Sequence, residues 1–196
     1  MSPRSHLTRT AVVQSAVDLI NTEGLEALTL NRLAVKLGIR TPSLYNHVNG
    51  LPGLMRELSI LNARYLAERL SEAAIGQSGP ELVTSVMQAY RAYIKEFTGL
   101  YMSTLRVSGT QEVVDLELEK EEARSLKVGM AVMASFGLEG EAAIHAVRGL
   151  RSLVHGFATL EVAGGFGMPL DLDESFTRLV KLFIAGLQRQ EVNGNS

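Results

Sequence analysis

Apolar residues recur along most of the chain at intervals of three and four residues, which is the spacing of one face of an α-helix. No alternating apolar and polar run has the length and flanking turns of a β-strand, and no long internal repeat occurs. Glycine and proline divide this pattern into segments, because glycine commonly ends helices and proline is favoured in their first turn. The predicted fold class is therefore all-α, with about nine helices.

The limits of these helices follow from candidate caps. The first three predicted helices begin after the candidate N-caps Thr8, Thr29 and Thr41, and they end at Gly24, Gly38 and Gly50. Longer helices are expected at about 52–74, 80–98, 114–136, 141–162 and 174–190, the last of them capped by Asp171 or Asp173. Residues 99–110 are expected to be short and irregular, because they contain Gly99 and Gly109.

The segment 29–48 predicts two short helices joined by a tight turn. Leu33 and Leu37 give the first helix an apolar edge, and Gly38 permits a positive φ angle at the turn. Leu44 and Val48 turn back toward that edge from the second helix, expected at about Pro42–Val48. Two short helices held at a wide angle are typical of a helix-turn-helix, and a helical hairpin with a solvated polar face is the alternative.

The outward face of the second helix carries small or polar side chains suited to DNA. Asn46 can pair with the edge of an adenine, whereas serine and threonine hydroxyls accept or donate. The ring of Pro42 and the methyl group of Thr41 can contact a thymine methyl group. This face favours DNA as the partner over the alternative, a helical module that binds a ligand or a protein.

Residues 7–55 resemble the N-terminal domain of TetR-family transcriptional repressors. The resemblance is carried by Glu23-Gly24, Leu28-Thr29-Leu30, Leu33-Ala34, Leu37-Gly38-Ile39 and Ser43-Leu44-Tyr45-Asn46-His47-Val48. It implies a DNA-binding domain at residues 1–52 and a regulatory and dimerisation domain at 53–196. It also implies a homodimeric repressor that binds double-stranded DNA at a palindromic operator and is released by a small-molecule effector.

The resemblance also assigns roles to single residues. It implies phosphate contacts from Tyr45 and His47, and a basic arm containing Arg4 and Arg9. The residues assigned to DNA binding are Thr29, Asn31, Arg40, Thr41, Pro42, Ser43, Tyr45, Asn46 and His47. Leu51 departs from the family, which usually has a lysine there, so we expect a shallower salt dependence of DNA binding.

The C-terminal half carries two apolar helices, which the resemblance pairs with their counterparts in a dimer. The residues assigned to the dimer interface are Leu150, Val154, Phe157, Phe176, Val180, Phe183 and Leu187. The candidates for a ligand pocket, or otherwise for core packing, are Tyr90, Tyr93, Phe97, Met102, Met130, Met133, Phe136 and His155. Residues 150–157 and 161–168 also resemble a TetR subgroup with a Trp-His-Gly motif, in which Val154 here replaces the tryptophan.

Charge, cysteine content and the motifs that are absent reduce the number of possible functions. The net charge is −2, but residues 1–69 carry eight basic against five acidic side chains, which favours a polyanion as partner of the N-terminal part. The absence of cysteine excludes disulfides and thiolate chemistry. No phosphate loop, nucleophile elbow or His-Glu-x-x-His motif occurs, so we expect no enzyme activity, cofactor or metal. No apolar run is long enough for a membrane span, so we expect a cytoplasmic protein.

Overall fold

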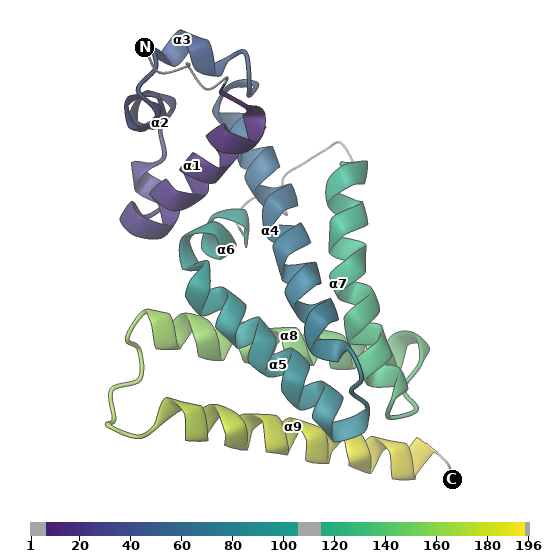
Figure 1. Ribbon diagram of the computed structural model, residues 1–196. Coiled ribbons are helices and arrows are strands. Elements are labelled where there is room, and N and C mark those ends of the chain that lie inside the picture. The colour runs from purple at the N-terminus through teal and green to yellow at the C-terminus, as the bar shows by residue number, and fades with distance from the viewer. Residues whose placement is uncertain (1–6, 106–114, 195–196) are drawn as a thin grey trace. The chain divides into compact units, whose positions relative to one another are not determined.

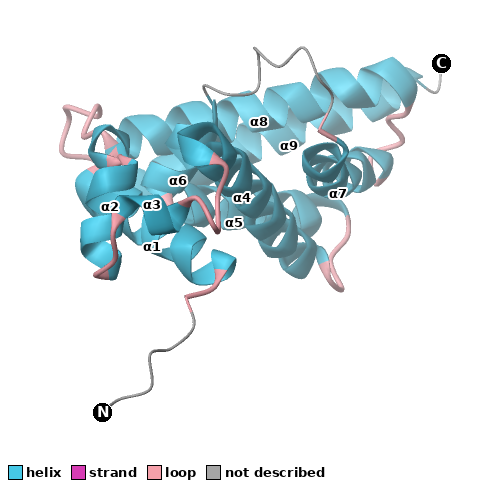
Figure 2. Cartoon of the chain, turned by 90° about the horizontal axis from the view of Figure 1, so that it is seen from above, coloured by secondary structure: helices cyan, strands magenta, loops and turns pink. Residues whose placement is uncertain are grey.

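The structure of the protein, a computed structural model, describes residues 7–105 and 115–194, with side chains up to residue 189. Within these residues every regular element is helical, which confirms the all-α prediction (Figures 1 and 2). The elements are α1 (Arg9–Glu23), η1 (Leu25–Ala27), α2 (Leu30–Leu37), α3 (Thr41–Leu44), α4 (Gly50–Ala74), α5 (Gly79–Glu96), α6 (Thr98–Leu105), α7 (Leu116–Ala134), α8 (Gly140–Val162) and α9 (Leu172–Gly194).

The chain divides into two compact units, which we describe separately. The N-terminal unit contains residues 7–62, 97–105 and 115–118 of the described chain, and the C-terminal unit contains 63–96 and 119–194. The N-terminal unit thus takes in α6 from the middle of the sequence. The predicted domain boundary after residue 52 stays a prediction.

The core of the N-terminal unit forms where α1 packs against α2 and α6 (Figure 1). Successive turns of α1 bury Val12, Ala16 and Leu19, because the apolar stripe repeats at helical spacing. Threonine side chains cap α1 and α2: Thr8 Oγ1 accepts from the backbone N–H of Ala11, and Thr29 Oγ1 accepts from that of Arg32, each at 3.1 Å. These two predicted N-caps are confirmed.

Helix α6 corrects the prediction that residues 99–110 are irregular. Residues 99–105 belong to a helix, and 106–110 lie outside the described residues. The cap of this helix comes from α1, because Asn21 Oδ1 accepts from the backbone N–H of Leu100 at 3.0 Å. Gly99 lies so close to the carbonyl group of Ile20 that any Cβ atom there would overlap it. Gly99, which predicted an interruption of helical structure, therefore permits a close contact between two helices.

In the C-terminal unit, α5 packs against both α8 and α9, and α8 also packs against α9 (Figure 1). The side chains buried between them include Val83, Val86, Met87, Leu150, Val154, Ala158, Phe176 and Val180. Asp171 caps α9, since its Oδ1 accepts from the backbone N–H groups of Asp173 and Glu174 at 2.7 and 2.9 Å. Of the two caps predicted for this helix, Asp171 is confirmed.

An arginine inside this unit joins three helices. Arg91 of α5 is 8% exposed, and its Nε and Nη2 donate to the two carboxylate oxygens of Glu161 on α8, at 2.7 Å each. Its Nη1 lies 2.7 Å from a carboxylate oxygen of Asp173 on α9. The guanidinium also lies over the rings of Phe176 and Phe157, at 4.9 and 5.3 Å from their centroids. The hydrogen bonds that Arg91 donates to Glu161 raise the pKa of Arg91 despite its burial, so the buried charge is retained.

No helix within the described residues has the length and apolar character needed to cross a membrane.

Candidate nucleic-acid interface

Helices α2 and α3 form the predicted helix-turn-helix. Gly38 follows α2 in the left-handed conformation, with φ at 67°, and its backbone N–H bonds to the carbonyl group of Val35 at 3.1 Å. The backbone N–H of Ile39 returns to the carbonyl group of Ala34 at 3.0 Å. This arrangement satisfies carbonyl groups at the end of α2 and turns the chain sharply into α3.

The second helix is shorter than predicted, and its cap differs. Helix α3 spans Thr41–Leu44 rather than Pro42–Val48, and its N-cap is Arg40, which has no side-chain capping bond. Thr41 is the first residue of the helix, so its predicted role as the cap is wrong. After Leu44 the chain continues in turns, where the backbone N–H groups of His47 and Val48 both bond to the carbonyl oxygen of Leu44.

The buried side of this segment fixes the orientation of its exposed side. Leu44 is 0% exposed and Val48 is 4% exposed, and both belong to the core of the N-terminal unit with Leu33. Among the residues assigned to DNA, Thr41, Ser43 and His47 are half-buried. The exposed ones are Thr29, Asn31, Arg40, Pro42, Tyr45 and Asn46. Burial of Leu44 and Val48, which lie four residues apart, leaves Pro42, Tyr45 and Asn46 on the solvent side.

The positive charges near this surface are only partly available to phosphates. Lys36 and Arg40 are exposed and form no ion pair with any described residue. Arg32 pairs with Glu23. Arg9, predicted to belong to a basic arm, pairs with Glu57 of α4, and Arg4 lies outside the described residues.

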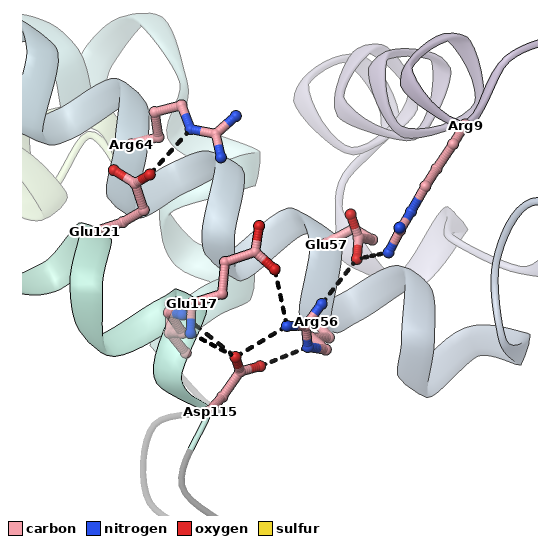
Figure 3. Close-up of polar contacts among 8 residues, drawn as sticks. Arg9, Arg56, Glu57, Arg64, Asp115, Glu117 and Glu121 are labelled. Atoms are coloured by element: carbon pink, nitrogen blue, oxygen red, sulfur yellow. Dashed lines mark hydrogen bonds and ion pairs between the residues drawn. The ribbon is translucent and has the colours of Figure 1, made fainter.

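Arg56 of α4 is the centre of a charged cluster in the N-terminal unit (Figure 3). Its Nε lies 2.5 Å from Oδ2 of Asp115, and its Nη2 lies 3.0 Å from Oε2 of Glu117. Its Nη1 lies 3.1 Å from Oε1 of Glu57, which also pairs with Arg9. The cluster therefore connects the first turn of α1, the second turn of α4 and the start of α7 (Figure 3).

Asp115 serves two purposes in this cluster. Its Oδ1 accepts from the backbone N–H groups of Glu117 and Leu118 at 3.2 and 3.3 Å, so it caps α7 as well as pairing with Arg56. The hydrogen bond from Arg56 lowers the pKa of Asp115 below its ordinary value. The cluster was not predicted from the sequence, because Asp115 and Glu117 lie 59 and 61 residues from Arg56. The local signal is Asp115 itself, an aspartate directly before the first residue of α7.

The comparisons with known proteins agree with this geometry. The family model for the tetracyclin repressor-like C-terminal domain matches residues 83–183. An uncharacterized HTH-type transcriptional regulator of Bacillus subtilis, YobS, is 31% identical over 95% of this chain and 96% of its own. Another HTH-type regulator, from Mycobacterium tuberculosis, is 32% identical over 97% of this chain and 86% of its own.

The chain belongs to the TetR family. It is therefore a helix-turn-helix transcriptional regulator, and its relatives are named as regulators rather than enzymes. The fold of a solved TetR variant agrees as well. This variant, from Acinetobacter baumannii in complex with minocycline, superposes on this chain with a TM-score of 0.71. It is 21% identical in sequence, and the match covers 95% of this chain and 99% of that one. The Trp-His-Gly subgroup stays a prediction.

The predicted ligand-pocket residues are divided between the two units of this TetR-family chain. Phe97 and Met102 belong to the N-terminal unit, and Met102 is exposed. The other six belong to the C-terminal unit. Of these, Tyr90, Tyr93, Met133 and Phe136 are buried, and Met130 and His155 are half-buried. Burial raises the pKa of Tyr93 and lowers that of His155. Their role as a ligand pocket stays a prediction.

The predicted dimer residues lie mostly inside the protomer. Leu150, Val154, Phe176, Val180 and Leu187 are at most 5% exposed, while Phe157 and Phe183 are half-buried. A separate groove of about 620 Å³ lies on α8 and α9. Its lining is Ala142, His145, Ala146, Gly149, Leu153, Leu179, Leu182, Phe183, Gly186 and Leu187. Two of the predicted dimer residues, Phe183 and Leu187, thus reach this surface.

Among the side chains that the structure describes, no three histidine or carboxylate groups lie together as metal ligands would.

Proposed function

We propose that the protein is a homodimeric repressor that binds a palindromic operator in the cytoplasm and is released by a small-molecule effector. The observation that carries this proposal is the exposed polar surface of α3 and the turn after it, held in place by buried Leu44 and Val48. Membership of a family of DNA-binding regulators supports it.

DNA contacts follow from the chemistry of this surface. Tyr45 and His47 have donors suited to phosphate oxygens, and the exposed charges of Lys36 and Arg40 add attraction that does not depend on sequence. Asn46 and Thr41 are suited to base edges in the major groove. With Leu51 in place of the family's lysine and Arg9 paired, we expect few phosphate contacts and a modest salt dependence.

Dimerisation is proposed for the groove on α8 and α9. Its lining combines small residues, such as Ala146, Gly149 and Gly186, with leucines, of which Leu182 is 72% exposed. Small residues let helices approach closely, and exposed leucines gain free energy when a partner covers them. A two-fold dimer would present two helix-turn-helix units to two half-sites of opposite orientation.

Effector release requires that a ligand bind one arrangement of the dimer more tightly than another. Helix α4 is the natural element for this coupling, because it begins directly after the helix-turn-helix and continues as one helix to Ala74. The TetR variant solved with minocycline supports a small-molecule effector. The candidate pocket residues Tyr90, Tyr93, Phe97, Met102, Met130, Met133, Phe136 and His155 remain those predicted from the sequence.

The deciding experiment is selection of bound sequences from random duplex DNA with the purified protein at physiological salt. We expect a palindromic consensus whose half-sites lie about one helical turn apart, or a multiple of it. The matched control is a variant in which Tyr45 and Asn46 are both alanine, which should select no consensus. If the native protein selects none either, the repressor proposal is wrong and a protein-binding role for the N-terminal unit is favoured.

A further inference from the structure

The two helices of the helix-turn-helix are joined by a hydrogen bond between side chains. Thr41, the first residue of α3, donates from Oγ1 to Oδ1 of Asn31, in the first turn of α2, at 3.2 Å. Asn31 is exposed and Thr41 is half-buried, so the pair lies at the surface. Thr41 is not an N-cap, and its hydroxyl group is therefore not committed to the start of α3.

This bond fixes the polarity of the Thr41 hydroxyl group. A hydroxyl group has one hydrogen to donate and two lone pairs to accept with, and it normally rotates to suit its partner. An amide oxygen can only accept, so Asn31 Oδ1 takes the single hydrogen of Thr41. What Thr41 then offers to any other partner is a lone pair. A threonine that would otherwise accept or donate becomes an acceptor alone.

An acceptor in the major groove distinguishes bases by their amino groups. Adenine presents N6–H and cytosine N4–H as donors, whereas guanine and thymine present acceptors at the corresponding positions. We propose that Asn31 is a positioning residue that makes Thr41 select an amino base, adenine or cytosine, over a keto base at one position of each half-site. This inference rests on the proposed function, since it requires that α3 contacts DNA.

The test compares four operator duplexes that differ at one position, namely the one where Thr41→Val changes base preference. We expect the native protein to bind duplexes with an amino base about five-fold more tightly than those with a keto base. A difference of about five-fold in affinity corresponds to the net contribution of one neutral hydrogen bond. Asn31→Ala should reduce that ratio toward one, because the hydroxyl group can then rotate. Asn31→Asp should keep the ratio, because a carboxylate also accepts from Thr41, although its charge weakens binding to every duplex.

A double variant separates positioning from direct contact. If Asn31 acts through Thr41, Asn31→Ala should change no base preference in the Thr41→Val background. A change that persists there would mean that Asn31 reads a base itself, and it would overturn the inference. So would an unchanged ratio in Asn31→Ala, or its loss in Asn31→Asp. Melting curves of all variants check that these surface substitutions leave the fold intact.

Failure of the inference and failure of the proposed function give different results. A native protein that selects an operator with no dependence on Asn31 contradicts the inference only. A native protein that selects no operator contradicts both.

Discussion

Tyr45 and Asn46 are neighbours on the turn after α3, and both are exposed. Their chemistry suits them to different tasks. The phenol group of Tyr45 carries one hydroxyl, which can donate to a phosphate oxygen, and phosphates are alike in every sequence. The amide group of Asn46 carries both a donor and an acceptor, and this pair matches the edge of an adenine. At the residue scale, replacing Tyr45 should therefore weaken binding to every DNA sequence, whereas the effect of replacing Asn46 should depend on the DNA sequence.

We expect Tyr45→Phe to weaken binding to all DNA sequences about equally, by about 1 kcal/mol, the worth of one hydrogen bond. Asn46→Ala should cost about 1–3 kcal/mol on the operator and relax one operator position. Titration of labelled duplexes, one operator and one unrelated, measures both. A loss confined to one sequence for Tyr45→Phe, or an unchanged preference for Asn46→Ala, would contradict the assigned roles.

Gly99 allows a second prediction at this scale. A Cβ atom there would overlap the carbonyl group of Ile20, so Gly99→Ala must push α6 away from α1. We expect a loss of about 1–3 kcal/mol in the free energy of unfolding, typical of overpacking. Gly156→Ala is the matched control: it lies inside α8 with nothing within 4 Å of the added atom, and it should stabilise by up to about 1 kcal/mol. Equal effects in chemical denaturation would show that α6 does not need the close contact.

At the scale of elements, the start of α7 depends on charge. Arg56 lowers the pKa of Asp115, so the carboxylate binds its proton more weakly in the folded protein than in the unfolded chain. Its contribution to stability is therefore complete above the ordinary carboxyl pKa of about 4. The contribution disappears as the pH falls through the lower pKa of the folded state. Since the Arg56 side chain is 36% exposed, solvent screens the pair and keeps the effect small.

We expect Asp115→Asn to lower the melting temperature by about 2–4 °C at neutral pH, with the difference closing below about pH 4. Asparagine still caps the helix, so the change removes the ion pair alone. Asp171→Asn is the control, because Asp171 caps α9 with no ion pair to any described residue. A constant difference between Asp115→Asn and the native protein from pH 7 to pH 3 would show that the ion pair contributes nothing.

At the scale of the whole molecule, the proposed function needs two chains. The groove on α8 and α9 leaves Leu182 largely exposed, which is costly unless a partner covers it. We expect Leu182→Glu to convert a dimer to a monomer and to weaken operator binding, since one helix-turn-helix then contacts only one half-site. Lys181→Glu, one residue earlier and also exposed, is the matched control and should leave the dimer intact.

Sedimentation equilibrium gives the molecular mass in each case. A native protein that sediments as a monomer of 21.3 kDa, or a Leu182→Glu variant that remains a dimer, would remove α8 and α9 from the interface.

The sequence by itself determined what depends on neighbours within one turn. Thr8, Thr29 and Asp171 cap the helices that follow them, because a short side chain with an acceptor bonds to N–H groups two or three residues later. Gly38 ends α2 for a similarly local reason. The helix-turn-helix was therefore predictable, along with the exposed side chains that its buried leucine and valine leave outside.

Only the tertiary structure decided what depends on distant residues. Gly99 and Gly109 predicted an irregular segment where α6 lies, and its cap, Asn21, is 79 residues from Leu100, where no local pattern reveals it. Arg91 and Glu161 lie 70 residues apart, so their buried pair was equally invisible. The apolar stripes of α8 and α9 did not show which side enters the protomer core, since hydrophobicity favours burial without specifying the partner. Packing against α5 determines which side is buried. It places Val154 and Phe176 in the protomer core and leaves Leu182 exposed to solvent.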